Sequence, residues 1–386
     1  MGKKSKSKSK RPPGKKDKKS GRTSQTKSQQ SGPKKRKNQG KVKPASSLVD
    51  SKSPSNSPPT TPGGSIGDTV VIDGVKYKKK RILGTGGSGS VFEIIREDNG
   101  TSFALKETSL RQNAEIYRGE VERLQTLKNC PHIIDLIAHD IIANNTILRM
   151  VLELGDGDLE SEVKKNKGTL DAATVRLYAY EIGKGIQEMH ENSIIHLDIK
   201  LANVLIISGT LKLVDFGLSA TLRKNEDHVI RDFMFGSNRP PEQIVPRKDG
   251  TYKLTKKVDI WGFGFIVYQM TYGRKPFSNY TNKNMLAILD PNIRLQHDIH
   301  ADPAITEFFE KCIQRDVEKR ATIEQLFAHR YLSEAEAIMQ DKLAAQTTMT
   351  TTMTTTGTSS TAPKKNGRGR RGTGHGVTTT QETVDK

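Results

Sequence analysis

The sequence is 386 residues long with a formal net charge of +20, yet only 33% of its residues are hydrophobic and 5% aromatic. A chain of this composition cannot bury most of its length in a core, which excludes an array of several packed domains and favours one large domain with polar tails. Residues 1–50 hold +16 of the charge, so the rest of the chain is close to neutral.

Two further classes of protein are disfavoured. Cys130 and Cys312 lie far apart without a CxxC or Cys/His spacing, which argues against a disulfide framework or a zinc site and favours the nucleus or the cytoplasm. The longest apolar stretch, Ile260 to Met270, is well short of the roughly 20 residues that span a bilayer. Lys6 stands where a myristoylation signal needs Ser or Thr. We expect no membrane association.

Both ends of the chain have the composition of disordered tails. Residues 1–68 are basic and Ser/Pro-rich, and residues 345–386 are Thr-rich and then rich in Arg and Gly, so neither can bury enough apolar surface to fold. The run KKRK at 34–37 fits nuclear import or binding to nucleic acid or acidic proteins, and a solvated charge run is the alternative. A salt dependence of binding that vanishes on deletion of residues 1–50 would assign the binding to the first tail.

Residues 77–332 read as a single folded domain whose first part is rich in strands. β-branched content and turn punctuation predict strands. They are expected at Lys76–Leu83, Val91–Ile95, Phe103–Leu105 and Ile147–Leu154.

The pattern then becomes helical. Apolar residues at spacings of 4, 3, 4 and 3 predict one buried stripe on a helix. They are Val175, Ala179, Ile182, Ile186 and Met189. Val204–Ile207 and Leu211–Val214 flank Ser208-Gly209 and predict a tight hairpin. The run from Val258 to Met270 is apolar almost all round, as in a helix at a domain centre. These patterns predict a mostly β first lobe and a mostly α second lobe.

The first chemical motif follows the first strand of the domain. LGTGGSGSV begins at Leu83 and places Gly84, Gly86 and Gly89 in G-x-G-x-x-G register, and glycines let backbone N–H groups approach phosphate oxygens. The same string opens dinucleotide-binding folds, so alone it is a weak signal. Here the loop leads into a strand at Val91, without the acidic partner that closes a βαβ unit, which disfavours a nicotinamide fold.

A lysine and a glutamate come next. FALK ends at Lys106, where the ammonium can reach ATP phosphates, and the helical segment after it can supply a carboxylate that fixes the ammonium. Glu115, Glu120 and Glu122 are all candidates. Glu120 is preferred because Leu124, one turn later, would then face the core.

The decisive cluster combines two motifs joined by the predicted hairpin. HLDIKLAN contains Asp198, Lys200 and Asn203, and DFG begins at Asp215. Asp198 would accept the proton of a substrate hydroxyl, Lys200 would neutralise the transferring phosphoryl group, and Asn203 with Asp215 would hold Mg²⁺ through oxygen atoms. This coincidence of motifs is typical of one reaction, phosphate transfer from Mg·ATP.

The domain thus resembles a eukaryotic protein kinase. The resemblance implies an α+β, two-lobe protein-kinase fold, with an antiparallel sheet plus one helix in the first lobe and a mainly helical second lobe. It also implies that Asp259 supports the catalytic loop and that Arg320 pairs with Glu242 of the PPE motif. Lys200 after Asp198 is the pattern of Ser/Thr-directed and dual-specificity kinases.

The same resemblance assigns the adenine site. Leu152 would be the gatekeeper, the Glu153 carbonyl and the Leu154 amide would face the adenine edge, and apolar side chains would sandwich the ring. The full expected nucleotide-binding set is Leu83, Gly84, Gly86, Gly87, Gly89, Val91, Ala104, Lys106, Glu120, Glu153, Leu154 and Leu205.

Other segments are similar to monopolar-spindle (TTK-type) dual-specificity kinases. They are GTGGSGSVF, YRGEVERL, HLDIKLANVLI, MTYGRKPF and AILDPNIRL. This resemblance implies protein substrates phosphorylated on Ser/Thr, with tyrosine left open, and a role in mitotic checkpoint signalling at kinetochores. The alternatives are a pseudokinase scaffold, or a protein whose basic tails bind nucleic acid or acidic partners. The oligomeric state is left open.

One departure from the kinase pattern concerns regulation. Leu197 stands where most kinases have an arginine that binds a phosphate on the activation loop, the segment between Asp215 and Glu242. We therefore expect basal activity without phosphorylation in the middle of this loop. Its hydroxyl residues are Ser219, Thr221 and Ser237. Its acids, expected to pair with Arg223 or Arg231, are Glu226, Asp227 and Asp232.

Overall fold

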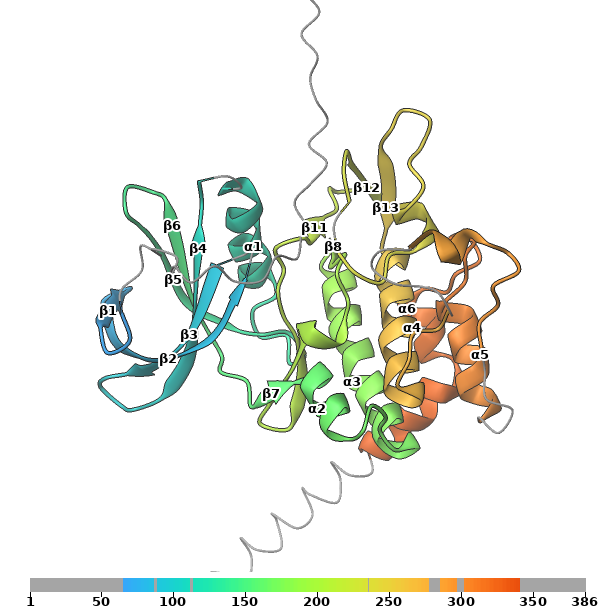
Figure 1. The fold of residues 1–386 in the computed structure, drawn as a ribbon, viewed down its shortest axis with the longest axis horizontal. Coiled ribbons are helices and arrows are strands. Elements are labelled where there is room, and N and C mark those ends of the chain that lie inside the picture. Colours follow the sequence, from blue (N-terminus) through green and yellow to red (C-terminus); the bar gives the residue numbers. More distant parts are fainter. Residues whose placement is uncertain are drawn as a thin grey trace, which may run out of the picture. The chain divides into compact units, whose positions relative to one another are not determined.

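The computed structural model describes residues 65–86, 89–111, 114–234, 236–277, 285–296 and 302–340. Over these residues it has the predicted α+β architecture, with an antiparallel sheet and one helix followed by a mainly helical part (Figure 1). Of the two tails predicted to be disordered, residues 1–64 and 345–386 lie outside this range. Residues 65–68 lie within it, and there the Gly67 N–H donates to the Lys79 carbonyl at 2.9 Å. Among the described helices, none is both long and apolar enough to cross a membrane.

The first lobe is built on a six-stranded antiparallel sheet with the order β1-β2-β3-β4-β6-β5. Alternate residues of β3 are buried, whereas β4 and β6 are buried over most of their length. Tyr77, Phe92, Ile94 and Leu105 form an apolar cluster on one face. The strands are β1 (Thr69–Ile72), β2 (Val75–Gly86), β3 (Gly89–Arg96), β4 (Ser102–Ser109), β5 (Leu136–Ile142) and β6 (Ile147–Leu152).

Helix α1 (Ala114–Thr126) is the single helix of the first lobe and is drawn beside the sheet in Figure 1. Its buried residues are Glu120, Val121 and Leu124, which lie within about one turn of each other and so on one side of the helix. Leu124 belongs to the large core cluster that also contains Phe216 of the second lobe. The carboxylate of Glu120 is therefore carried on a helix anchored to both lobes.

The second lobe is organised around two long helices, α3 (Ala172–Glu191) and α4 (Lys257–Tyr272). The predicted apolar stripe on α3 is buried throughout, and α4 is buried on almost every side. Gly262 makes this packing close, because a Cβ atom there would lie 2.8 Å from Cβ of Ile199 in the catalytic loop. Burial of α4 thus fixes the position of that loop.

The remaining elements of the second lobe are short. They are β7 (Gly157–Asp158), α2 (Leu159–Lys165), β8 (Ile194–Ile195), a 3₁₀ turn at Leu201–Asn203, β9 (Val204–Ile207), β10 (Thr210–Leu213), β11 (Ala220–Thr221), β12 (His228–Arg231), a 3₁₀ turn at Pro241–Gln243, β13 (Tyr252–Thr255), a 3₁₀ turn at Met285–Leu289, α5 (Pro303–Cys312) and α6 (Ile323–Phe327).

The predicted hairpin is confirmed as β9 and β10, which pair antiparallel. Its two turn residues, Ser208 and Gly209, have φ angles of 50° and 81°. Two positive φ values in a two-residue turn match the right-handed twist of the strands. At the open end of the hairpin the Val214 N–H donates to the carbonyl of Asn203 at 3.1 Å. This pairing brings the end of HLDIKLAN next to the start of DFG.

All four strands predicted in the first lobe lie within or overlap β2, β3, β4 and β6. The sheet also contains β1 and β5, which the sequence patterns did not predict. β1 lies before residue 77 and pairs in register with the start of β2. β5 contains His139 and Asp140, and these polar residues interrupt the apolar alternation that identifies a strand.

Candidate active site

Lys106 lies at the centre of the first group of predicted site residues. Its ammonium Nζ is 2.8 Å from Oε1 of Glu120 and 3.1 Å from Oδ1 of Asp215. Glu120 is buried on α1, and Leu124 one turn later faces the core. Of the three glutamates left open by the sequence, Glu120 is the one whose carboxylate reaches Lys106.

The charges of this group are fixed by their mutual contacts. Burial alone would lower the pKa of Lys106, but the charges and hydrogen bonds of Glu120 and Asp215 outweigh burial and raise that pKa. Burial raises the pKa of Asp215, and the ammonium of Lys106 outweighs it, so the pKa of Asp215 lies below its ordinary value. Both groups are therefore ionised at neutral pH, as a site for phosphates and a cation requires.

One buried carboxylate holds the catalytic loop. Asp259, in the first turn of α4, accepts hydrogen bonds from the backbone N–H groups of His196 at 2.8 Å and Leu197 at 2.9 Å. Its Oδ2 also lies 2.9 Å from Nε2 of His190. Leu197 has a φ of 68°, a left-handed conformation that costs a non-glycine residue about 1–3 kcal/mol. The hydrogen bonds that Asp259 accepts offset this strain and orient the next residue, Asp198.

Asp198 is almost completely buried, and polar groups contact both of its carboxylate oxygens. Oδ2 of Asp198 lies 2.6 Å from Nζ of Lys200 and 3.2 Å from Nδ2 of Asn203. The backbone N–H of Ser237 donates to Oδ1 at 3.1 Å. A Cβ atom on Gly236 would lie 3.1 Å from this oxygen, so glycine leaves room beside it. The end of the activation loop therefore closes against the carboxylate expected to orient the substrate.

The glycines of the first motif have two different surroundings. Gly84 and Gly86 face open space, since a Cβ atom on either would meet no other atom within 4 Å. Gly89 has a φ of 128°, and a Cβ atom there would lie 2.0 Å from the carbonyl oxygen of Glu107. Gly89 thus lets the two strands approach, while Gly84 and Gly86 leave room for a ligand. Gly87 lies outside the described residues.

The residues expected around the adenine come from both lobes. Leu83 is partly exposed on β2, and Val91 lies on the next strand, β3. Ala104 on β4 pairs directly with Leu152 on β6. Leu205 lies on β9 of the second lobe and is half-buried. The sheet register therefore gathers four of these side chains from neighbouring strands of the first lobe, with the fifth across the lobes.

Comparison with known proteins agrees with this geometry. Residues 77–332 match the protein kinase domain family. The chain belongs to the protein kinase family. Membership implies ATP as the phosphate donor and a divalent metal ion as its partner.

Several curated kinases are similar to this domain. The serine/threonine-protein kinase mph1 of Schizosaccharomyces pombe is 30% identical over 69% of this chain and 44% of its own length. The serine/threonine-protein kinase MPS1 of Saccharomyces cerevisiae is 27% identical over 70% of this chain and 39% of its own length. The dual specificity protein kinase Ttk of Danio rerio is 30% identical over 71% of this chain and 29% of its own length. The chain therefore spans less than half the length of these relatives.

Peptide geometry changes one assignment in the kinase domain's adenine site. The Glu153 carbonyl and the Leu154 N–H belong to the same peptide bond, and in a trans peptide these two groups point in opposite directions. They cannot both face one adenine edge. The resemblance therefore places at most one of these two backbone groups at the adenine edge.

Two oxygen donors fit a divalent metal ion. Asn203 uses its Nδ2 to donate to Asp198, which leaves its amide oxygen available. Asp215 contacts Lys106 through Oδ1, and its side chain is 40% exposed, so its second oxygen is accessible. No cluster of three or more His, Cys, Asp or Glu side chains suited to a metal occurs in the described part of the chain. Two protein oxygens suit an ion that takes its other ligands from phosphates and water.

The sequence analysis overlooked two polar links near the nucleotide site. The Glu153 carboxylate lies 2.8 Å from Nζ of Lys212 and accepts a hydrogen bond from the backbone N–H of Asp135. Asp158 caps α2 by accepting hydrogen bonds from the N–H and Oγ of Ser161. The D-x-x-S spacing is an N-cap signal that could have identified the second link. Both links hold side chains of the segment between β6 and α2.

The activation loop is held by apolar and backbone contacts. Leu197, at the position of the usual arginine, is buried in a cluster with Leu222 and Leu254, against which Val229 and Met234 of the loop pack. The loop also pairs its strand β12 with β13, and β11 with β8. Leu197 and the two short strand pairs thus hold the activation loop, which in most kinases is held by an arginine bound to a phosphate.

The expected charge pairs in the loop form only in part. Arg223 lies 3.7 Å from Glu226, and both side chains are exposed, so the pair contributes little. Asp227 pairs with His228 and not with an arginine. No hydrogen bond or ion pair in the described part of the chain involves the Arg231 guanidinium. Fixed acids are therefore a minor part of what holds the loop.

Phosphatase-treated enzyme is expected to keep most of its initial rate on a short peptide. The apolar cluster around Leu197 and the β12–β13 ladder hold the loop through side chains and backbone groups that need no phosphate. The rate should be measured in a single-turnover assay too brief for autophosphorylation. A loss of about tenfold or more, recovered by preincubation with ATP, would show instead that a phosphate governs the loop.

Proposed function

We propose that the chain is a protein kinase that transfers the γ-phosphate of Mg·ATP to serine and threonine side chains of proteins. One observation supports this best: the Lys106 ammonium bridges Glu120 and Asp215, while Asp198 and Lys200 lie in contact with each other nearby. A pseudokinase scaffold usually lacks at least one of these groups. Here all of them are present with charges suited to transfer.

The residues divide the reaction between them. Lys106 would hold the nucleotide phosphates. The oxygen of the substrate hydroxyl would bond to the γ-phosphorus while the bond from that phosphorus to ADP breaks, and Asp198 would accept the proton of the hydroxyl. Lys200 would neutralise the oxygens of the transferring group. Asn203 and Asp215 would hold Mg²⁺, which when bound supplies positive charge to the phosphates. Catalysis by positioning and charge is sufficient for this reaction.

The test is transfer of labelled phosphate from ATP to a protein mixture by the full chain, followed by analysis of the labelled amino acids and phosphosite sequencing. We expect phosphoserine and phosphothreonine, because Lys200 follows Asp198 at the spacing of such kinases. Phosphotyrosine in addition would establish dual specificity. Absence of any transfer, with ATP bound, would favour the scaffold.

We also propose a role in mitotic checkpoint signalling at kinetochores, supported by similarity to the kinases mph1, MPS1 and Ttk. The check is whether cells treated with a microtubule poison still arrest in mitosis when only an inactive variant is present. Continued arrest would contradict this role.

The +16 charge of residues 1–50 supports a further proposal, that this segment binds nucleic acid or acidic proteins. Deletion of residues 1–50 should remove the salt dependence of that binding. It should leave turnover on a short peptide unchanged.

A further inference from the structure

Lys79 is a buried lysine in the middle of a basic run on β2. Its neighbours Lys78 and Lys80 are exposed, whereas Lys79 is only 1% exposed. The period of a strand explains the difference, because Tyr77 and Lys79 lie two residues apart and so point to the same face of the sheet. That face carries the apolar cluster of the first lobe. A charge at this position therefore needs a partner inside the fold.

The partner of Lys79 is Glu107 on β4. Nζ of Lys79 lies 2.9 Å from Oε1 and 3.0 Å from Oε2 of Glu107, and neither side chain is more than 7% exposed. The same Nζ lies 4.2 Å from the centre of the Phe92 ring on β3. Since β3 lies between β2 and β4, the pair joins three neighbouring strands across one face (Figure 1). Arg149 pairs with Glu107 in the strand register, but its Nε donates to Asp140 at 2.7 Å.

Stability alone does not explain a charged pair at this place. The attraction between two buried charges only partly offsets the cost of removing them from water, and well-packed apolar residues of similar size are often as stabilising or more so. The surrounding face is apolar, so a methionine and a leucine would suit it. What the ion pair adds is geometry, because one ammonium that contacts both oxygens of a carboxylate fixes how the two strands lie.

The pair lies between the two groups that are expected to contact the nucleotide phosphates. Lys106 precedes Glu107 on β4, so the strand period directs its side chain to the opposite face. On β2, Lys79 is the last buried residue before Gly84 and Gly86. The pairing of β2 with β3 is irregular here, with two register shifts between Lys79 and Gly84. Because a shifted ladder fixes a strand less well, the glycine segment depends on the anchor at Lys79.

Glu107 also contacts the other arm of the glycine hairpin. Its carbonyl oxygen is packed so closely against Gly89, at the start of β3, that a Cβ atom there would lie 2.0 Å away. Glu107 thus holds β2 through its side chain and β3 through its backbone, directly beside Lys106. We propose that Lys79 and Glu107 are positioning residues, which set the glycine hairpin at the distance from Lys106 at which both contact the same phosphates.

The test compares nucleotide binding by the full chain and by the double variant Lys79→Met with Glu107→Leu. The apolar pair keeps the volume and removes both charges, so the melting temperature should stay the same or rise. The affinity for a non-hydrolysable ATP analogue with Mg²⁺ should fall about tenfold, the effect of losing one hydrogen bond to a charged group. The affinity for adenosine should not change, because adenosine has no phosphate for the hairpin to contact.

Arg81→Met is the matched control. Arg81 also lies on β2, two residues nearer the glycines, and pairs with Glu93, but its side chain is 68% exposed. Its loss should change neither affinity. A selective loss of ATP-analogue affinity as large as that of the double variant would show that any change of charge on β2 weakens phosphate binding, and the proposal would be wrong.

Two results with the double variant contradict the proposal. Equal weakening of the ATP analogue and adenosine would mean that the variant loosens the whole lobe. Unchanged affinity for both would mean that an apolar pair positions the hairpin equally well.

Glu107→Gln carries the test if the apolar pair fails to fold. Its amide keeps the size of the carboxylate but offers Lys79 one oxygen, so a selective loss of about threefold is expected, and no selective loss would contradict the proposal. The positioning role rests on the proposed kinase function, but binding is measured without transfer. A chain that shows the selective loss and yet transfers no phosphate would refute the kinase function alone.

Discussion

Asp198→Asn is expected to slow phosphate transfer about 10²–10⁴-fold, the usual contribution of a general base. The amide keeps the size and shape of the carboxylate but cannot take the proton of the substrate hydroxyl. It would also lose the charge that holds Lys200 at 2.6 Å. Nucleotide affinity should change little, since Lys106, Glu120 and Asp215 form a separate group of contacts.

The measurement is single-turnover transfer from labelled ATP to a peptide, with nucleotide binding followed separately. A single turnover isolates the chemical step from product release. Asp249→Asn is the matched control, because that aspartate is exposed in a turn and its loss should leave the rate unchanged. Wild-type-like transfer by Asp198→Asn would show that this carboxylate is not the group that orients the acceptor.

The positions of residues in elements with a regular local pattern could be predicted from the sequence. The hairpin β9–β10 follows from two apolar runs and Ser208-Gly209, and it alone brings Asn203 close to Asp215. The buried stripe of α3 follows from its periodicity. Glu120 could be preferred over its neighbours because Leu124 had to face the core. In each case a few residues and one regular element determine the outcome.

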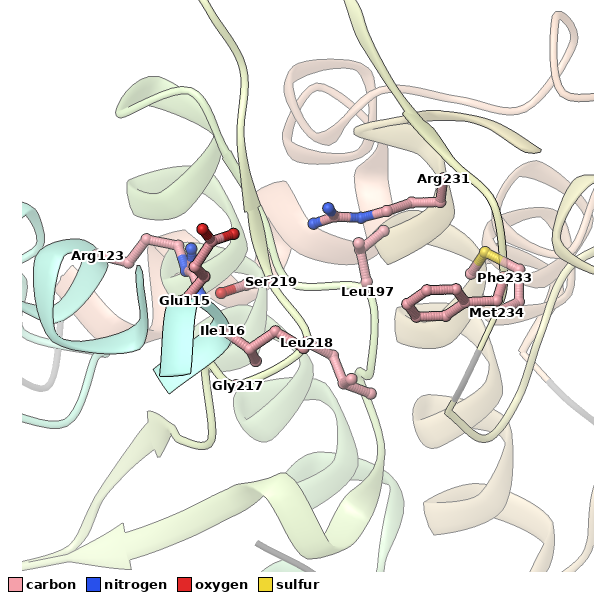
Figure 2. Close-up of a pocket in the computed structure, with 10 residues that line it drawn as sticks. All are labelled: Glu115, Ile116, Arg123, Leu197, Gly217, Leu218, Ser219, Arg231, Phe233 and Met234. Atoms are coloured by element: carbon pink, nitrogen blue, oxygen red, sulfur yellow. The ribbon is translucent and has the colours of Figure 1, made fainter. Parts of the chain in front are cut away.

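Residues that depend on long-range packing could not be predicted. Leu197 was visible as a missing arginine, but nothing near it in sequence indicates that Leu222 and Leu254 would bury it. The ladder between β12 and β13 joins segments that carry no shared motif. Arg123 and Arg231 line one pocket only because α1 and the activation loop pack together (Figure 2). Such contacts are set by the tertiary fold and leave no periodic signal.

The adenine site shows a third kind of limit. A motif gives the register of the segment after β6, but it does not say which face each backbone group presents. Glu153 and Leu154 are adjacent, and the planar trans peptide between them decides the matter against the pair that the motif suggested.

Arg320→Ala is expected to cost about 3–5 kcal/mol of folding free energy, because it breaks a buried ion pair and strands one partner. The Arg320 side chain is fully buried. Its Nη1 and Nη2 contact the two oxygens of Glu242 at 2.6 and 3.0 Å, and its Nε donates to the Gln314 carbonyl. Since domains are stable by only about 5–15 kcal/mol, this loss is a large share of the total.

The consequence can be measured as a melting temperature and as a urea midpoint. For a domain of this size each kcal/mol shifts the melting temperature by about 2–4 °C, so Arg320→Ala should melt about 6–20 °C lower. Arg247→Ala is the matched control, because its pair with Asp249 is exposed and should shift the melting temperature by no more than about 2 °C. The double variant Arg320→Met with Glu242→Gln should recover part of the loss, since it leaves no charge unpaired. Equal melting temperatures of Arg320→Ala and Arg247→Ala would mean that the Glu242 carboxylate finds another partner or water. The Arg320–Glu242 pair would then not anchor Glu242 at the end of the activation loop.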